Sequence, residues 1–409
     1  MKCRHCGSKV KLPLLDLGSS PPSNAYLTSS TLSDPEKWFP LRVMVCERCW
    51  LVQTEDFTQA NELFNAGYSY FSSFSNSWLA HSQSYVADMV ARFNLTNKSH
   101  VVEVASNDGY LLQYFKAFNI PCTGVEPTAS TAAVARAKDI SIVEDFFGKR
   151  LANELAAQGK QADLTVANNV LAHVPDINDF VAGFATLLKP LGVATFEFHH
   201  LLKLIEENQF DTIYHEHFSY LSLTAVNSIC AVNGLSVFDV EEYPTHGGSL
   251  RVFVQRIDCG QQARSSRVDK MLQREGKVGI SNAEFYAGFQ AKTDKIKNDF
   301  LAFLLEAKSQ CKSVAAYGAA AKGNTLLNYA GIRSDLISFV VDLNPAKQDK
   351  FMPGSRIPIV EELRLKQEKP DYVVILPWNL KEELVLQLKY VRTWGGRFVT
   401  AVPAMRIEP

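Results

Sequence analysis

The sequence predicts an α/β protein with three domains, two of which are built on Rossmann-like sheets. Strand-like apolar runs alternate with helical segments between about residues 100 and 200, and a second alternation starts near residue 314. A short segment rich in Cys, Pro and Ser precedes both alternations. We therefore place the domain limits at 1–66, 67–258 and 259–409.

The composition is that of an ordinary globular protein. Its 409 residues are 46% hydrophobic and 21% charged with a net charge of −1, so no basic block favours nucleic acid. The start lacks the apolar run of a signal peptide, and no run approaches the roughly 18–20 residues of a membrane span. Few cysteines argue against a disulfide framework. We expect a soluble cytoplasmic protein without nucleic-acid or membrane partners, and a monomer is compatible with the sequence.

The first 60 or so residues show few helical patterns. Apolar residues recur at helical spacing over 76–95, which predicts a helix that leads into the first parallel sheet. The segments between its strands have the length of crossover helices. We expect these strands at 101–105, 122–125, 140–143, 164–167 and 193–198.

A helix from about residue 224 and two further strands, at 236–241 and 249–255, could complete the edge of that sheet in antiparallel fashion. Residues 260–312 are charged and helical, with Gly276 and Gly279 as expected interruptions. The second alternation then begins. We expect its strands at 314–317, 337–341, 372–376 and 396–401.

Two Cys-x-x-Cys pairs form the strongest local motif: Cys3 with Cys6, and Cys46 with Cys49. Zinc prefers four soft ligands in a tetrahedron, and each pair supplies two thiolates. Because all four positions are cysteine, none remains open for substrate, and we expect a structural zinc ion that stabilises a small segment. Reduced cysteines without metal, or a redox or nucleic-acid-binding ribbon, are the alternatives.

The turn 103–109, Glu-Val-Ala-Ser-Asn-Asp-Gly, follows the first strand of the first sheet and opens a helix. Such a turn lets backbone N–H groups approach a ligand, here the amino-acid end of S-adenosylmethionine. The usual Gly-x-Gly is missing, because alanine and serine stand where glycines are common. We expect cofactor contacts from Glu103, Ala105, Ser106, Asn107 and Gly109.

Three later strand ends support this assignment. An acid ends the second strand about twenty residues on, where it can hold both ribose hydroxyls. An Asp-Phe pair after the third strand suits adenine, and two asparagines end the fourth strand at the carboxyl edge, where ligands bind. A nicotinamide cofactor, or no ligand, is the alternative. We add Glu126, Pro127, Asp145, Phe146, Asn168 and Asn169 to the expected cofactor site.

The segment 214–222, Tyr-His-Glu-His-Phe-Ser-Tyr-Leu-Ser, is dense in proton-transfer groups. Histidine titrates near neutral pH and suits a general base. A nearby glutamate can orient it or raise its pKa, and a tyrosine can donate to an oxyanion. We therefore expect catalysis here. The alternatives are a histidine that caps a helix or bonds a carbonyl, and a second zinc site through His215 and His217.

Other candidates carry weaker signals. Tyr68 and Tyr70 lie in a polar-aromatic stretch that could line a sugar site or pack on the surface. His173 lies one helical turn beyond the asparagine pair and either faces the cleft or is a buried structural residue.

Two small-residue turns could contact substrate. His246, Ser249 and Arg251 could grip phosphate or sugar, or form a bulge that leads into a strand. The turn containing Lys322 and Asn324 opens a helix, a geometry that binds phosphate, and the lysine could add a point charge. A tight turn with a solvated lysine is the alternative.

The chain resembles the sugar C-3 methyltransferases of deoxysugar biosynthesis in its zinc pairs and in EVASNDGYLL, GVEP, ANNVLAHV, YHEHFSYLS, HGGSLR and YGAAAKGN. The resemblance covers nearly the whole chain. It implies a zinc-binding domain, a class I methyltransferase domain and a C-terminal Rossmann-like domain that together methylate C-3 of a nucleotide-diphospho-4-keto-6-deoxyhexose. It also implies His217 as base, Tyr214 and Glu216 beside it, and Tyr68 and His173 as further active-site residues.

The expected mechanism starts from the acidity of the C-3 hydrogen beside the 4-keto group. His217 removes it, Tyr68 or Tyr214 stabilises the enolate oxyanion, and C-3 attacks the sulfonium methyl in line. If Tyr214, Glu216 and His217 serve one site, their segment must be an irregular loop, because a strand would separate them. An O- or N-methyltransferase of another small acceptor and a non-enzymatic zinc-ribbon binding module are the other function classes.

Overall fold

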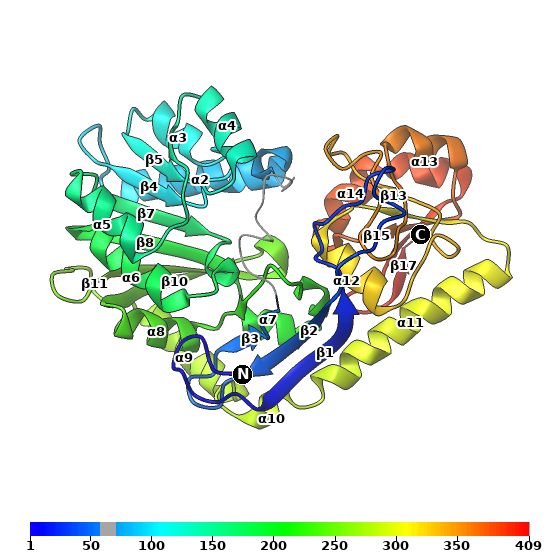
Figure 1. Cartoon of the computed structure of the whole chain (residues 1–409), viewed down its shortest axis with the longest axis horizontal. Coiled ribbons are helices and arrows are strands. Elements are labelled where there is room, and N and C mark those ends of the chain that lie inside the picture. Colours follow the sequence, from blue (N-terminus) through cyan, green and yellow to red (C-terminus); the bar gives the residue numbers. More distant parts are fainter. Residues whose placement is uncertain (58–70, 409) are drawn as a thin grey trace.

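The computed structural model describes residues 1–57 and 71–408, which contain three β-sheets (Figure 1). A seven-stranded and a six-stranded sheet form two α/β units that stand side by side. A four-stranded sheet lies below and between them in this view. Tyr68 and Tyr70 fall outside the described residues, so their expected roles stay predictions, as do the three domain limits.

The seven-stranded sheet has the order β10-β11-β8-β7-β4-β5-β6. Neighbouring strands from β6 to β8 are parallel, and β11 lies antiparallel between β8 and β10. This confirms the predicted parallel sheet with an antiparallel edge pair. Its strands are β4 (Val101–Val104), β5 (Cys122–Val125), β6 (Ser141–Val143), β7 (Ala162–Asn168), β8 (Leu188–His199), β10 (Leu235–Tyr243) and β11 (Ser249–Arg256).

Both faces of this sheet are buried, which explains its nearly continuous apolar strands. Along β11, Phe253 packs in one core with α2 and α3, whereas Val252 and Val254 pack in another with α6 and α8. Successive side chains of a strand point to opposite faces, so the two cores flank the sheet. The helices of this unit are α2 (Asn76–Arg92), α3 (Leu112–Ala117), α4 (Ala129–Ala137), α5 (Lys149–Ala157), α6 (Ile177–Leu187) and α8 (Leu223–Val232).

The four-stranded sheet combines the N-terminal segment with a strand from far along the chain. Strands β1 (Leu12–Ser20), β2 (Phe39–Val45) and β3 (Val52–Thr54) are antiparallel. The fourth, β9 (Ser219–Tyr220), pairs with β3, so the histidine-rich segment is attached to the N-terminal sheet. None of these strands was predicted.

Helices α9 (Ser266–Val278), α10 (Ala283–Tyr286) and α11 (Phe289–Ser309) connect the two α/β units along the lower edge of Figure 1. Gly279 ends α9 in the left-handed conformation at φ 87°, as predicted. The predicted interruption at Gly276 is wrong, because this residue lies inside α9. The buried face of α11 shares one core with β1 and the six-stranded sheet.

The six-stranded sheet has the order β14-β13-β12-β15-β16-β17, and only β17 is antiparallel. The strand predicted at 337–341 shrinks to two residues, and β14 and β17 were not predicted. The strands are β12 (Val314–Tyr317), β13 (Val340–Val341), β14 (Ile359–Val360), β15 (Tyr372–Ile375), β16 (Arg397–Thr400) and β17 (Arg406–Glu408). The helices are α12 (Ala321–Tyr329), α13 (Glu362–Glu368) and α14 (Lys381–Gln387).

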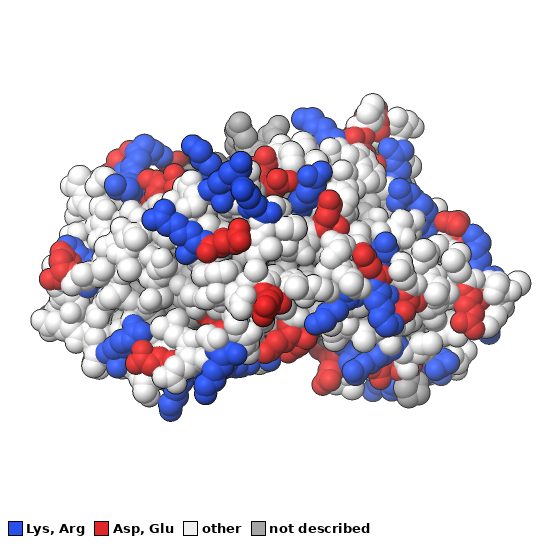
Figure 2. Space-filling view, turned by 90° about the horizontal axis from the view of Figure 1, so that it is seen from below, with Lys and Arg blue, Asp and Glu red and all other residues white. Residues whose placement is uncertain are grey.

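Within the described residues, no helix has both the length and the apolar character that crossing a membrane requires. On the face seen from below in Figure 2, acidic and basic side chains are interspersed rather than gathered into one area of a single sign.

Candidate functional site

The four cysteines of the two Cys-x-x-Cys pairs converge as predicted. Their Sγ atoms lie within 4.8 Å of one another, and the Cys3–Cys49 and Cys6–Cys46 sulfurs are each 3.5 Å apart. A tetrahedral zinc ion at about 2.3 Å from each sulfur needs sulfur separations of about 3.8 Å, so the four thiolates fit it. The protein therefore carries a structural zinc site. Among the described residues no other group of three possible ligands converges, so His215 and His217 form no second one.

The zinc site is linked to the histidine-rich segment through β3. The Gln53 side chain donates to Cys3 Sγ at 3.3 Å, and its backbone pairs with Ser219 of β9. The next residue, Thr54, donates from Oγ1 to the His217 carbonyl at 3.0 Å. The segment that holds zinc therefore also fixes the backbone of His217.

The turn 103–109 crosses the carboxyl ends of β4 and β5. Ala105, Asn107 and Gly109 have φ values of 57°, 49° and 75°, in the left-handed region that most side chains avoid. Glu126, at the end of β5, closes the turn: its Oε2 accepts the Asn107 N–H at 2.9 Å and its Oε1 accepts the Thr128 N–H at 2.9 Å. Hydrogen bonds to the Glu126 carboxylate, together with Gly109, thus shape this loop.

Polar atoms without partners gather around the same turn. Among the described residues, Ser106 Oγ, Asp108 Oδ1 and both amide atoms of Asn168 are buried and make no hydrogen bond. Buried polar groups are normally paired, so a polar ligand at this edge would satisfy them. Burial also raises the pKa of Glu103 well above its ordinary value. The donor set fits the amino-acid end of S-adenosylmethionine.

The expected adenine and ribose contacts lie along the same edge. Asp145 accepts from its neighbour's N–H and from Arg150, and the Phe146 ring is 46% exposed, which leaves a face for a base. Asn169 adopts φ 53° and donates its N–H to the Glu197 carbonyl at 2.7 Å. Pro127 is half-buried beside the acid that ends β5.

The segment 213–218 is an irregular turn and not a strand. This agrees with the expectation that Tyr214, Glu216 and His217 can serve one site only on an irregular backbone. The His217 N–H donates to the Tyr214 carbonyl at 2.9 Å, and the two rings are tilted against each other with centroids 3.9 Å apart. His217 Nδ1 donates to the Thr212 carbonyl at 2.8 Å, which leaves the lone pair on Nε2. Burial, together with His173 nearby, holds the pKa of His217 well below its ordinary value. The ring is therefore neutral at pH 7 and able to accept a proton.

His173 joins this group from η2 (Leu171–His173), which follows β7. Its ring meets that of His217 edge-on at 4.6 Å, and its Nδ1 donates to the Glu216 carbonyl at 2.8 Å. Burial lowers the pKa of His173 to about 4. The Glu216 carboxylate instead accepts from Asn24 at 3.0 Å, and burial raises its pKa.

His215, by contrast, lies against Phe39 of β2. Its Nε2 donates to the Phe39 carbonyl at 3.2 Å, and the two rings meet edge-on. The carbonyl-bonding alternative thus describes His215.

The six-stranded unit reaches the histidines through Lys322. Its Nζ donates to the His246 carbonyl at 3.3 Å and to Asn379 Oδ1 at 3.0 Å, and lies 4.6 Å from the Trp378 ring centre. Burial lowers the pKa of Lys322 to about 8. Asn324 is buried, and its amide has no partner in the described part of the chain. The lysine is therefore held between the units and is not a solvated side chain.

Ser249 and Arg251, which lie in β11 itself, have contacts that favour the structural alternative. Ser249 Oγ donates to the Thr245 carbonyl at 2.9 Å. The Arg251 side chain is only 1% exposed and donates from Nη2 to Glu197 at 2.7 Å. His246, with φ 57°, lies in η4 (Thr245–Gly247) and offers its carbonyl to the lysine of α12.

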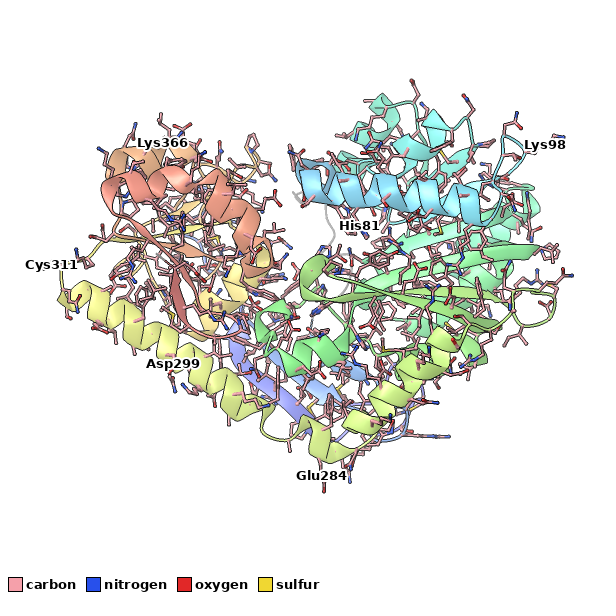
Figure 3. The ribbon with its side chains drawn as sticks, turned by 180° about the vertical axis from the view of Figure 1, so that it is seen from behind. His81, Lys98, Glu284, Asp299, Cys311 and Lys366 are labelled. Carbon is pink, nitrogen blue, oxygen red and sulfur yellow. The ribbon has the colours of Figure 1, made fainter. Side chains whose placement is uncertain are left out.

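Sequence reasoning missed three polar residues near this cluster. His81 projects from the underside of α2 in Figure 3, and its Nε2 lies 2.9 Å from both oxygens of Glu197. His199 ends β8 with Nε2 2.5 Å from Gln209 Oε1, and Asp211 accepts from the Trp378 indole at 2.7 Å. The His-His pair after the strand at 193–198 was a readable signal; the other two contacts depend on long-range packing.

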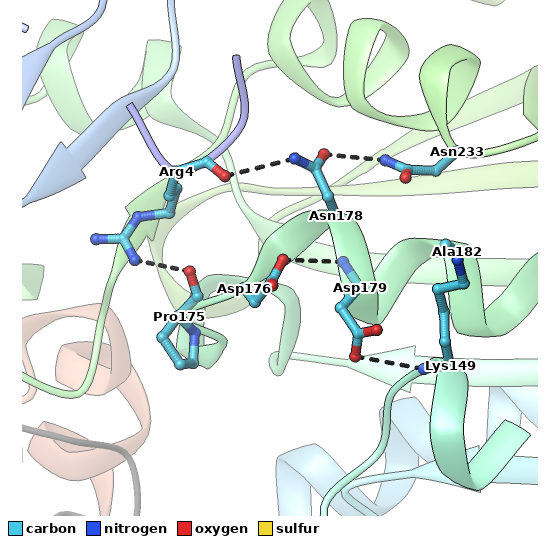
Figure 4. Close-up of a pocket in the computed structure, with 8 residues that line it drawn as sticks. All are labelled: Arg4, Lys149, Pro175, Asp176, Asn178, Asp179, Ala182 and Asn233. Carbon is cyan, nitrogen blue, oxygen red and sulfur yellow. Dashed lines mark hydrogen bonds between the residues drawn. The ribbon is translucent and has the colours of Figure 1, made fainter. Parts of the chain in front are cut away.

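A surface pocket of about 630 Å³ lies elsewhere, between the first zinc-binding turn and helices α5, α6 and α8 (Figure 4). Arg4 reaches the Pro175 carbonyl there, and Asp179 accepts the Lys149 N–H. None of the predicted site residues lines it. The candidate site is therefore the carboxyl edge of the seven-stranded sheet with the adjoining histidine turn.

Comparisons with known proteins agree with this arrangement. Three family models match: a zinc binding domain over 3–64, a methyltransferase domain over 78–240 and a C-methyltransferase C-terminal domain over 244–403. The C-methyltransferase NovU of Streptomyces niveus is 34% identical over 406 residues, which are 99% of this chain and 96% of that protein.

Two solved structures each resemble part of the chain. The PH0226 protein of Pyrococcus horikoshii is 13% identical with a TM-score of 0.39, over 49% of this chain and 100% of that one. Magnesium protoporphyrin IX methyltransferase of Synechocystis, with bound SAH, is 17% identical with a TM-score of 0.36, over 44% of this chain and 83% of that one.

Proposed function

Because the chain belongs to the C-methyltransferase family, we propose that its S-adenosylmethionine-dependent reaction methylates C-3 of a nucleotide-diphospho-4-keto-6-deoxyhexose. The observation that carries the proposal is the neutral His217 ring, which has Nδ1 bonded to a carbonyl and Nε2 available as a base. Methyl transfer to oxygen or nitrogen needs no base that can deprotonate carbon. Methyl transfer to a carbon of a keto-sugar does need such a base.

The residues of the turn have separate roles in this reaction. His217 Nε2 takes the proton from C-3, and the electron pair of the broken C–H bond moves onto the keto oxygen as an enolate. Tyr214, against the His217 ring, is the hydrogen-bond donor to that oxygen within the described residues. His173 meets the base edge-on, with ring centroids 4.6 Å apart, and restricts its ring. After the bond between C-3 and the methyl carbon has formed, His217 releases its proton to water.

S-adenosylmethionine supplies the methyl group when bound. The turn containing Ser106, Asn107 and Gly109 would hold its amino-acid end, Glu126 its ribose, and Asp145 with Phe146 its adenine. Asn168 and Asn169 would line the edge between these groups and the base.

The proposal is tested by mass spectrometry of nucleotide-4-keto-6-deoxyhexoses incubated with the protein in heavy water. We expect a gain of one methyl group with S-adenosylmethionine, and deuterium at C-3 without it. His217→Asn should still bind S-adenosylmethionine but lose roughly 10²–10⁴-fold in both exchange and methylation. His215→Asn, two residues away and bonded to Phe39, is the matched control and should retain both. A protein that neither methylates nor exchanges any of these sugars would contradict the proposal.

A further inference from the structure

The loop that follows β1 docks on the second Rossmann-like unit. Leu27 of this loop exchanges backbone hydrogen bonds with Phe351, at 3.0 and 2.8 Å. One residue earlier, the Tyr26 hydroxyl donates to the Ala319 carbonyl at 2.6 Å. Ala319 follows β12, so the loop lies at the carboxyl edge of the parallel strands, where Rossmann-like units bind their ligands.

The acid at this edge is paired within the protein. In the first unit, Glu126 closes the cofactor turn by accepting two backbone N–H groups. Asp342, after β13, repeats this pattern by accepting the N–H groups of Ala319 and Asn344, each at 2.8 Å. Here, however, Lys347 Nζ lies 3.4 Å from Asp342 Oδ2 and also donates to the Ala319 carbonyl at 2.8 Å. A lysine and the loop tyrosine therefore lie where a cofactor ribose would contact this acid.

The docked loop brings Asn24 to the histidine turn. Its Nδ2 donates to Glu216 Oε1 at 3.0 Å. Glu216 is only 2% exposed, and its Oε2 has no hydrogen-bond partner among the described residues. Buried carboxylate oxygens are normally paired, so an O–H or N–H group of a bound ligand would satisfy Oε2. The next residue along the chain is His217, the base of the proposed function.

We propose that Asn24 is a positioning residue, which is held by the second Rossmann-like unit and binds Glu216 Oε1 so that Oε2 accepts a hydrogen bond from the sugar. The inference rests on the proposed function, which places the sugar beside His217. A carboxylate that is held at one oxygen keeps the orientation that a bound substrate needs, whereas a free one rotates. The first unit thus binds the methyl donor, and the second binds a loop of its own chain.

The test exchanges donor and acceptor between the two side chains in the full-length zinc-loaded protein. In Glu216→Gln, the amide oxygen accepts from Asn24 and the NH2 group replaces Oε2, so the acceptor for the sugar is lost. In Asn24→Asp/Glu216→Gln, the carboxylate at position 24 accepts from that NH2 group, and the amide oxygen replaces Oε2. We expect KM for the keto-sugar nucleotide to rise roughly 10-fold in Glu216→Gln and in Asn24→Asp. The double variant should return to within about threefold of wild type.

A measurement without substrate separates this inference from the proposed reaction. The ¹³C signal of the Glu216 carboxyl, assigned through Glu216→Gln, reports its pKa. In Asn24→Ala this pKa should rise by about one unit, because a donor to the charged form is lost. The other titratable groups that face Glu216 stay unchanged in this variant, namely Tyr26 of the loop, His173 of η2 and Tyr220 of β9.

Two further variants address the loop. Thr28→Ala is the matched control, because the Thr28 hydroxyl bonds within the loop to Ser30 and Thr31; it should change neither KM nor the titration of Glu216. Tyr26→Phe removes the bond to the second unit. It should lower the protection of the loop from hydrogen exchange and raise KM, and unchanged protection would count against docking through this residue.

A double variant that binds the sugar nucleotide no better than the weaker single variant would overturn the inference. An unchanged Glu216 titration in Asn24→Ala would overturn it as well, whether or not a keto-sugar is methylated. A shifted titration in a protein that neither methylates nor exchanges any keto-sugar would leave Asn24 as the residue that positions Glu216 and would reject the proposed reaction.

Discussion

Replacing Arg251 with methionine should destabilise the seven-stranded sheet, because it removes the partner of a buried carboxylate. Arg251 of β11 faces Glu197 of β8, and their side chains are 1% and 0% exposed. The guanidinium donates from both Nε and Nη2 to Glu197 Oε2, at 3.2 and 2.7 Å. It also lies over the rings of Tyr85 and Tyr243, at 4.6 and 4.1 Å from their centres.

The expected loss follows from the pKa of Glu197. Burial alone would raise this pKa, yet the hydrogen bond from His81 and the charge of Arg251 bring it from 4.5 down to about 2. A lowering of this size corresponds to about 3 kcal/mol of stability, shared between His81 and Arg251. This stability is present above pH 4.5 and is lost as the pH falls toward 2. Breaking a buried pair typically costs about 3–5 kcal/mol, so we expect about 3 kcal/mol for Arg251→Met at pH 7.

Urea unfolding followed by hydrogen exchange in peptides from β8 and β11 measures this loss. Arg256→Met, on the same strand, is the control: its partner Asp258 is 63% exposed, and the change should cost less than about 1 kcal/mol. The contrary result is a free energy of unfolding for Arg251→Met within about 1 kcal/mol of wild type, together with a raised KM for the sugar nucleotide. Arg251 would then bind substrate, and its assignment as the structural partner of Glu197 would fail.

Two other perturbations test the zinc and cofactor sites. Cys49→Ser should lower zinc content, protection of β3 and β9 from hydrogen exchange, and turnover together, because Gln53 and Thr54 connect the zinc site to His217; Cys311→Ser, at an exposed position, should change none of these. Unaltered turnover in metal-free protein would show that the connection from the zinc site to His217 through Gln53 and Thr54 does not affect catalysis. Glu126→Gln should weaken S-adenosylmethionine binding by roughly 10–100-fold in calorimetry, because an anionic acceptor is lost; an unchanged Kd would remove Glu126 from the ribose site.

Features that depend on local spacing were predictable. The two cysteine pairs gave the zinc site, and the apolar runs from Val101 to Phe198 gave the parallel strands, because burial on both faces leaves a clear pattern. The density of polar groups around His217 marked the turn that we propose to be catalytic. The need for an irregular backbone there followed from side-chain alternation in a strand.

What the sequence concealed depends on contacts between distant segments. The two-residue β9 has no periodicity to read and exists only because β3 lies beside it. The Trp378–Asp211 bond joins positions 167 residues apart, and a tryptophan after a strand usually indicates packing. His81 has an ordinary place on an amphipathic helix, and its role appears only with Glu197 opposite. Strand β13 is shorter than the apolar run 337–341, because only Val340 and Val341 of this run pair with β12.

The pairing of β9 with β3 also sets an order of events during synthesis. The N-terminal sheet cannot be completed until the chain has emerged past Tyr220, and Leu27 finds its bridge partner Phe351 only when most of the six-stranded unit has emerged. The earliest residues to leave the ribosome are thus among the last to reach their final neighbours, and the open edge of β3 is exposed in the meantime. A nascent chain stalled before residue 219 should therefore contain strands β4 to β8 without β10 and β11. It should also contain β1, β2 and β3 without their partner β9.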